Sequence, residues 1–411
     1  MGKSVLLNTV RLLGCLCVAS AAHAGPYPAQ SGISAAGDDA SVAANNPAGM
    51  TLLDSRQYRA DMYTFISDST FEGQVGDNGP MFVSESDSVT VIPSFSFVQP
   101  FKDDWRFGFT FLGMGFSEDY GEDWPARYII QDYSLLYLTA FPSIAKKVTD
   151  KLSLAASLML TYTVFEQSKA VLNLPPGSAD GQMVLDVDGT TVGYSASMLY
   201  EFTDQTRFGA VYRSELNPDL EGSLDFSGLT PATEDLLQAA GVLDAVPTAT
   251  SRSPQSINAG IYHEFDNTSA FTVDVVWMEF SEFSLTEIYL DGSQLISSDP
   301  TYEDIFAFSA GYHMPLSERL RLGFGAFYAQ EMVTDENRTM LLRLDDVWSA
   351  GVGIEWQWTD TRLLNVSLNY MEIGDAPTTS PDVPGFGSVS GKYTDRGIIY
   401  LDLALSWGSS R

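Results

Sequence analysis

Strict alternation of apolar and polar residues over long stretches is the feature that most constrains this fold. In residues 399–407 every odd position is apolar, whereas the even positions include Asp402, Ala404 and Ser406. A period of two places alternate side chains on opposite faces of a sheet. Such stretches run for about ten residues or more, enough for a tilted strand to cross a bilayer, whereas typical strands have about five or six. We therefore predict an all-β chain that crosses a membrane with its strands.

The alternating stretches number fourteen, an even count as in single-chain bacterial barrels. They span residues 56–66, 90–100, 105–116, 133–147, 152–166, 189–202, 206–215, 255–265, 268–286, 302–314, 319–331, 345–358, 361–373 and 394–407. The connections alternate between short and long, as periplasmic turns and outer loops do in such barrels. The expected fold is a fourteen-stranded antiparallel transmembrane β-barrel over residues 56–411, in the outer membrane of a Gram-negative bacterium, with both mature termini in the periplasm.

Residues 1–24 have the features of a secretory signal peptide. Lys3 and Arg11 supply positive charge, an apolar run follows, and Ala22-His23-Ala24 forms a small-x-small cleavage site. Both cysteines of the chain, Cys15 and Cys17, lie in this segment, so no disulfide is expected in the mature protein. The net charge of −31 argues against nucleic acid as a partner, because nucleic acid requires basic patches.

Residues 37–50, GDDASVAANNPAGM, interrupt this pattern. Small and turn-forming residues dominate the stretch, and neither a helical nor a strand period is present. Compact irregular backbone needs hydrogen-bond partners. We therefore expect residues 25–55 to form a plug, or hatch, inside the barrel, although Asn-Pro is also an ordinary turn signal. The candidate hatch residues are Asp38, Asp39, Asn46, Pro47 and Ala48.

The chain resembles the FadL/TodX family of outer-membrane transporters. The resemblance rests on the stretch GDDASVAANNPAGM and on FLGMGFSEDY (111–120), FGAVYRSEL (208–216), VVWMEFSEF (275–283) and YEDIFAFSAGY (302–312). It implies a fourteen-stranded barrel with an amino-terminal hatch and a passive importer of hydrophobic molecules, by default long-chain fatty acids, with aromatic hydrocarbons as the other class. It also implies capture at the outer loops, displacement of the hatch and sideways exit through a gap at the third strand.

Gly113 and Gly115 lie in the third strand at the position that the resemblance implies for the gap. Glycine interrupts strands at bulges and close backbone approaches, although barrel strands also contain glycine for packing. A helix is predicted in the connection 216–254, capped by Thr230 with Pro231 at its first position. Its apolar face, either a ligand-collecting surface or a cover for the barrel, comprises Leu236, Leu237, Ala240 and Leu243.

Four arginines share the inward, polar parity of their predicted strands: Arg207, Arg213, Arg319 and Arg321. They are candidates to bind a fatty carboxylate, and the alternative is that they pair with acidic side chains of the barrel. An uncharged hydrocarbon would need neither.

No catalytic constellation, cofactor site or metal site is predicted, since neither His263 nor His313 is placed beside a nucleophilic serine. The competing hypothesis is a plugged porin for small solutes or a barrel that displays its loops. The expected partners are a hydrophobic small molecule and outer-membrane lipid and lipopolysaccharide, with the protein acting as a monomer.

Overall fold

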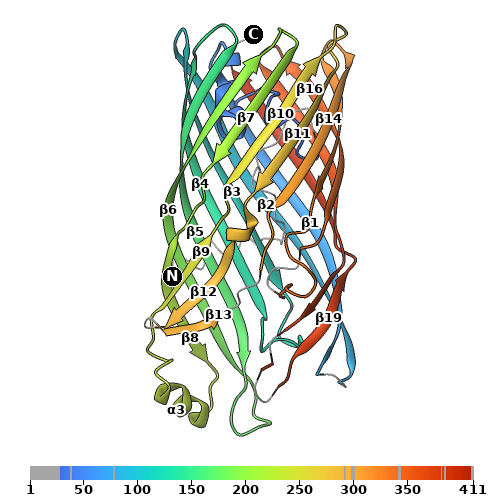
Figure 1. Cartoon of the computed structure of the whole chain (residues 1–411). Coiled ribbons are helices and arrows are strands. Elements are labelled where there is room, and N and C mark those ends of the chain that lie inside the picture. Colours follow the sequence, from blue (N-terminus) through green and yellow to red (C-terminus); the bar gives the residue numbers. More distant parts are fainter. Residues whose placement is uncertain are drawn as a thin grey trace.

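The computed structural model describes residues 28–37, 39–76, 79–290, 293–297, 301–340, 344–380, 382–383 and 386–408. The predicted signal peptide and Asp38 lie outside these ranges. The described chain forms an antiparallel sheet that closes on itself (Figure 1). Among the described residues, no helix is both long and apolar enough to cross a membrane.

The described wall of the barrel contains fourteen strands, each paired antiparallel with the next, and the last pairs with the first. In order they are β1 (Gln57–Val75), β2 (Met81–Lys102), β3 (Trp105–Asp119), β4 (Asp132–Lys147), β5 (Leu152–Val171), β6 (Gly181–Glu201), β7 (Thr206–Arg213), β10 (Ser256–Glu264), β11 (Ala270–Met278), β14 (Ile305–Ser317), β15 (Leu320–Ala329), β16 (Val347–Thr359), β17 (Arg362–Ile373) and β20 (Gly397–Gly408). The predicted fourteen-stranded barrel is thereby confirmed.

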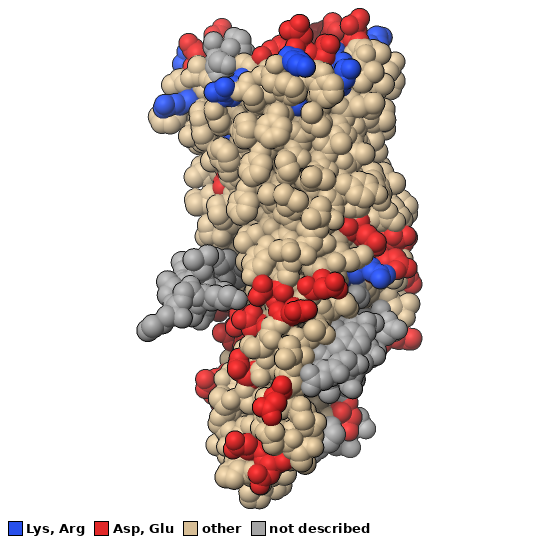
Figure 2. Space-filling view, turned by 90° about the vertical axis from the view of Figure 1, so that its left-hand side faces the viewer, with Lys and Arg blue, Asp and Glu red and all other residues tan. Residues whose placement is uncertain are grey.

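Alternation along the strands gives the barrel an apolar outer face and a more polar inner face. On β17, Leu368 and Tyr370 are 52% and 51% exposed, whereas Ser367 and Asn369 are buried. Figure 2 shows a broad band with almost no charged side chains, bounded by a charged upper end and by a lower part on which mostly acidic side chains are spread. Such a band suits the hydrocarbon core of a bilayer, where exposed charge is costly.

Several strands extend further than predicted at one end of the barrel. Most of residues 67–89 and 167–188, expected to be loops, belong to the hairpins β1–β2 and β5–β6. These segments contain more polar residues, yet they still alternate, and pairing with a neighbour satisfies their backbone groups. Six shorter strands extend the same end: β8 (Asp219–Ser227), β9 (Pro247–Arg252), β12 (Ser284–Leu290), β13 (Ser293–Ser297), β18 (Ala376–Thr379) and β19 (Val389–Thr394).

The stretch 268–286, predicted to be one strand, is divided in the structure. Strand β11 ends at Met278, and the 3-10 turn η2 (Phe280–Glu282) separates it from β12. We call the end with the long connections the loop end and the opposite end, with the short turns and the carboxyl terminus, the turn end (Figure 1).

Candidate functional site: the lumen and the amino-terminal segment

The amino-terminal segment, residues 28–37 and 39–55, is buried along most of its length within the barrel, near the turn end (Figure 1). It contains the short helix α2 (Val42–Asn45) and the 3-10 helix η1 (Pro47–Leu52). Asn46 caps η1, because its side-chain oxygen accepts a hydrogen bond from the Ala48 N–H at 3.1 Å. Pro47 occupies the first position of η1, where its fixed φ and missing N–H are tolerated.

Asn46 also fastens the segment to itself and to the wall. Its Nδ2 donates to the Ser34 carbonyl at 2.6 Å and to the Met198 carbonyl of β6 at 3.1 Å. The Ala48 N–H additionally donates to Ser197 Oγ at 3.0 Å. These contacts supply hydrogen-bond partners of the kind expected for an irregular segment, and two of the predicted residues, Asn46 and Ala48, make them.

Two of the four predicted arginines hold backbone carbonyls of the segment. Arg207 of β7 donates from Nε to the Ala35 carbonyl at 2.6 Å. Its guanidinium carbon, Cζ, lies 3.9 Å from the centre of the Tyr262 ring. Arg213, on the same strand, donates from Nη2 to the carbonyls of Ala44 and Asn45, both at 2.9 Å. Sequence reasoning placed both arginines on the inner face but could not identify carbonyl groups as their partners.

The other two predicted arginines pair with acids. Arg321 of β15 contacts Glu355 of β16 at 3.1 Å. The predicted strand 319–331 begins one residue later than expected, so Arg319 lies in the turn before β15 instead of on the inner face. Its side chain is 62% exposed and 3.6 Å from Asp360, which removes it from the lumen.

Sequence reasoning missed several buried acidic and basic residues that contact the segment. Asp274 of β11 accepts the backbone N–H groups of Gly32 and Ser34 at 2.7 and 2.9 Å. Arg59 of β1 is completely buried and forms ion pairs with Asp39 of the segment and with Asp61 of its own strand. The available signal was a charged residue at an inward position of a strand that has an apolar outer face.

The ladder between β2 and β3 stops partway along these strands. Their pairing runs from Lys102–Trp105 to Ser94–Leu112, and β2 continues to Met81 paired only with β1 among the described strands. Beyond Leu112, β3 remains paired with β4 as far as Asp119. The two predicted glycines, Gly113 and Gly115, therefore lie on β3 just past the point where β2 and β3 separate.

Gly115 occupies a position that no other residue type could share without movement. A Cβ built on it would lie 2.4 Å from the Leu135 carbonyl oxygen and 3.0 Å from Leu136 Cα, both in the backbone of β4. At Gly113 the nearest atoms are side-chain carbons of Ile92 and Leu138, at 3.3 and 3.5 Å. Glycine is thus required for close approach at Gly115 and is less restricted at Gly113.

An apolar cluster fills the lumen beside this separation, between the segment and the loop end. We call it the lumen cluster. Its buried members are Ala29, Ile33, Tyr63, Phe65, Ile92, Val276, Met278, Phe280, Tyr302, Ile305, Ala307, Phe327, Ala329, Met332, Val333, Leu344, Val347, Met371, Ile373, Ile398 and Tyr400. A smaller group links the segment to β3, because Ala44 of α2 packs against Leu112 at the last β2–β3 pair.

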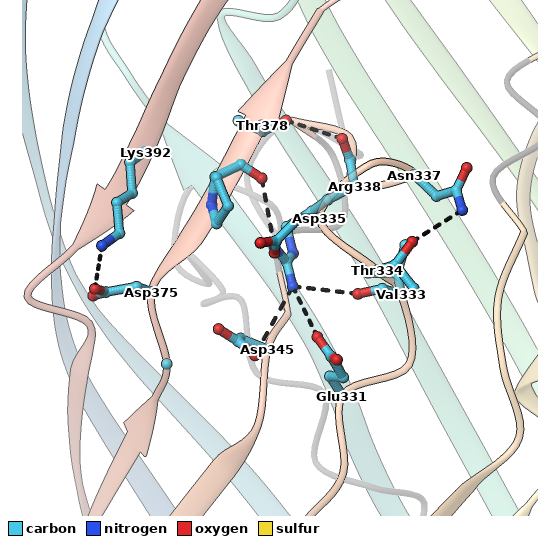
Figure 3. A network of polar contacts seen from close by, with 12 residues as sticks. Glu331, Val333, Thr334, Asp335, Asn337, Arg338, Asp345, Asp375, Thr378 and Lys392 are labelled. Carbon is cyan, nitrogen blue, oxygen red and sulfur yellow. Dashed lines mark hydrogen bonds and ion pairs between the residues drawn. The ribbon is translucent and has the colours of Figure 1, made fainter.

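Residues 330–340, which connect β15 toward β16, fold around Arg338 (Figure 3). The Arg338 side chain is completely buried and lies 3.3 Å from Glu331 and 3.9 Å from Asp345, and it donates to the Val333 carbonyl. The Thr378 hydroxyl of β18 donates to the Arg338 carbonyl at 3.1 Å. Burial, and next the negative charge of Asp345, raises the pKa of Glu331 against the opposing effect of Arg338.

The predicted outer helix is α3 (Pro231–Ala239), at the far tip of the loop end (Figure 1). Thr230 caps it, and the Leu174 N–H donates to Thr233 Oγ1 at 2.9 Å, which ties the helix to the β5–β6 connection. Leu236 is 57% exposed. Of the other predicted apolar residues, Ala240 is exposed and Leu237 and Leu243 are half-buried, so the apolar face remains largely open.

Among the described residues, no group of three or more His, Cys, Asp or Glu side chains is arranged to hold a metal ion. The charged groups that contact the segment are engaged with its backbone or with one another, an arrangement suited to holding a polypeptide in the lumen.

Comparisons with known proteins agree with this architecture. A family model described as outer membrane protein transport protein (OMPP1/FadL/TodX) matches residues 5–401. The long-chain fatty acid transport protein of Escherichia coli is 20% identical, with 84% of this chain and 83% of that protein covered.

Solved structures show the same fold. A Pseudomonas aeruginosa FadL homologue superposes with a TM-score of 0.82 at 19% identity, over 92% of this chain and 96% of that one. The toluene transporter TodX of Pseudomonas putida gives 0.66 at 16% identity, over 95% and 99%. The family and the fold are those of passive transport channels. The chain belongs to the outer membrane protein transport protein family (OMPP1/FadL/TodX) and is an outer-membrane β-barrel transporter of the kind that carries fatty acids or hydrocarbons.

Proposed function

We propose that this protein is a passive importer of hydrophobic molecules, with long-chain fatty acids as the default cargo. The cargo is collected at the loop end, passes into the lumen cluster and displaces the amino-terminal segment, which acts as a hatch. It then leaves sideways between β2 and β3. The observation that carries this proposal is the end of the β2–β3 ladder at Ser94–Leu112, beside the lumen cluster.

Sideways release follows from the physics of the cargo. Transfer of a chain of about sixteen carbons into water would cost on the order of 12 kcal/mol at about 0.8 kcal/mol per methylene. A gap in the wall passes the chain to the apolar interior of the membrane without that cost. Ile92 belongs to the lumen cluster and lies next to Gly113, so apolar side chains reach the edge of the separation.

Coupling between the hatch and the gap has support in the contacts of β3. Ala44 packs on Leu112, and Arg106 near the start of β3 donates to the Leu53 carbonyl at 2.7 Å. Displacement of the segment removes packing from the strand that borders the opening. The segment and the exit are therefore expected to move together.

The lumen arginines matter differently to the two cargo classes. Arg207 and the Nη2 group of Arg213 are occupied by carbonyls of the segment, so these donors become available to a carboxylate only after the segment moves. An aromatic hydrocarbon needs no such partner and remains the second cargo class. One structural neighbour, TodX, is a toluene transporter.

The proposal also includes the orientation of the barrel in the membrane, its oligomeric state and the role of α3. The turn end faces the periplasm with both mature termini, the loop end faces outward toward lipopolysaccharide, and the protein acts as a monomer. α3, with its open apolar face, is a collecting surface for the cargo.

The transport proposal is tested by uptake of labelled oleate and labelled toluene, and by growth on each, in cells with and without the gene. Uptake that depends on the gene supports an importer, and the preferred label identifies the cargo class. Equal uptake and equal growth would reject it. Deletion of residues 25–53 should raise conductance in planar bilayers, and a wild-type conductance already equal to the deletion variant would favour an open porin.

A further inference from the structure

Three buried carboxylates compete for one buried guanidinium on the inner face of the wall. Arg59 pairs with Asp39 of the amino-terminal segment and with Asp61 of β1, and Asp402 of β20 also acts on it electrostatically. Arg59, Asp61 and Asp402 are at most 6% exposed. Acids outnumber the arginine three to one, so negative charge on one carboxylate disfavours negative charge on the others.

Two atoms in this group have no hydrogen-bond partner in the described part of the molecule: Nη2 of Arg59 and Oδ1 of Asp402. A buried donor and a buried acceptor are both costly when unsatisfied. In the β1–β20 register Asp402 is opposite Tyr63, and the next inner-facing pair toward Arg59 is Asp61–Ala404. Arg59 and Asp402 therefore lie on the same inner face on either side of Asp61, and neither belongs to the segment. The wall thus contains a spare acceptor for the same arginine that holds the segment.

We propose that Arg59 exchanges Asp39 for Asp402 when the segment leaves its seat, so that Asp402 is a positioning residue that makes release of the hatch easier. Loss of one partner from a buried ion pair is strongly unfavourable, because it leaves a buried charge uncompensated. Asp402 removes that penalty by replacing Asp39. This inference rests on the proposed function, in which the segment moves during transport.

The exchange predicts opposite effects for two acids that act on the same arginine. Asp39→Asn removes charge from the segment but keeps the Oδ1 acceptor for Ser41, whose N–H and hydroxyl contact it at 2.9 and 2.6 Å. It should release the segment. Asp402→Asn removes both the replacement partner and the repulsion against Asp39, so it should hold the segment more firmly.

The test measures how readily the segment becomes accessible. Cys15 and Cys17, the two cysteines of the sequence, lie within the predicted signal peptide, so a single cysteine at position 44, Ala44→Cys, reports on α2. The rate of maleimide labelling is measured on the purified mature protein, residues 25–411, in liposomes. Asp39→Asn should raise the rate about tenfold or more, and Asp402→Asn should lower it about threefold or more.

Asp61→Asn is the matched control, because Asp61 contacts Arg59 from the wall whether or not the segment is seated. It should change the rate less than either other variant. Asp402→Glu keeps the carboxylate and should label at the wild-type rate. Asp402→Ser, with the same expected decrease, replaces Asp402→Asn if that variant does not fold, as judged by its heat-modifiable migration.

An unchanged or faster rate in Asp402→Asn overturns the exchange, since general damage to the barrel would loosen the segment in every variant. An unchanged or slower rate in Asp39→Asn overturns it as well. Uptake of labelled oleate and toluene by the same variants tests the proposed function separately from the exchange of partners at Arg59. If the two variants change labelling in opposite directions but uptake is the same in cells with and without the gene, the exchange is supported and transport is rejected.

Discussion

Gly209→Ala provides a sharp test of how the amino-terminal segment is seated. Gly209 faces inward on β7, and a Cβ built on it would lie 1.8 Å from the Ser34 carbonyl oxygen and 2.7 Å from Asn46 Nδ2. Ordinary contact begins at 3.4 Å, so the Ser34 carbonyl would have to recede by about 1.6 Å. The segment is the part that gives way, because β7 is paired on both sides by β6 and β10.

The size of the effect follows from two contributions. Overpacking typically costs about 1–3 kcal/mol. The displaced carbonyl also loses its hydrogen bond from Asn46, at 2.6 Å, which is worth about 1 kcal/mol. A total of about 2–4 kcal/mol multiplies the unseated fraction roughly thirty- to several-hundredfold, since about 1.4 kcal/mol is a factor of ten.

The assay is conductance of purified protein in planar bilayers, together with maleimide labelling of Ala44→Cys. Both should increase in Gly209→Ala, while heat-modifiable migration shows that the barrel remains folded. Gly353→Ala is the matched control, because the nearest atoms to its added Cβ, in Ser367 and Pro28, are 3.4 and 3.6 Å away. Equal conductance and labelling in wild type and Gly209→Ala would refute the described seating of the segment on β7.

Four further outcomes are expected. Arg213→Met should increase labelling at position 44, because it removes two charge-assisted hydrogen bonds worth about 1.5–3 kcal/mol each; an unchanged rate would contradict that role. Gly115→Ala should slow uptake of labelled oleate more than Gly113→Ala does, given the backbone contact at 2.4 Å, and equal rates would count against the position of the exit. Thr233→Val should speed proteolysis near α3, because docking of the helix loses about 1 kcal/mol with the bond from Leu174, whereas the exposed control Gln238→Ala should not. Because the pKa of Glu331 is raised in the folded protein, its contribution to stability is present below the ordinary value near 4.5 and is lost as pH rises through the raised value. Carboxyl NMR titration should detect the raised pKa, and the pKa should be lower in Asp345→Asn.

The resting position of Arg207 and Arg213 shows where inference from the sequence was limited. Strand parity places a side chain on the inner or outer face, and it did so correctly for both residues. It does not identify what occupies the lumen at that height. The partners are carbonyls of Ala35, Ala44 and Asn45, which lie more than 160 residues away in the chain, so a local pattern contains no trace of them.

Arg319 illustrates a second limit. Its parity matched that of Arg321, but parity applies only inside a strand, and β15 begins at Leu320. A shift of one residue at a strand end moves a side chain from the lumen to an exposed turn. The hairpins β1–β2 and β5–β6 show the same limit: the sequence predicts loops for their polar extensions, whereas in the structure these residues pair with a neighbouring strand.

Alternation along the chain was enough to predict the barrel, its fourteen wall strands and its apolar exterior. A period of two presents one continuous face to lipid wherever strands are long enough to span the membrane. The grouping of Arg59, Asp39, Asp61 and Asp402, and the point where β3 separates from β2, could be seen only in the folded chain. The cause is closure of the sheet. When a sheet forms a ring, side chains from strands far apart in the chain converge in one lumen, and their partners depend on the register of every strand between them.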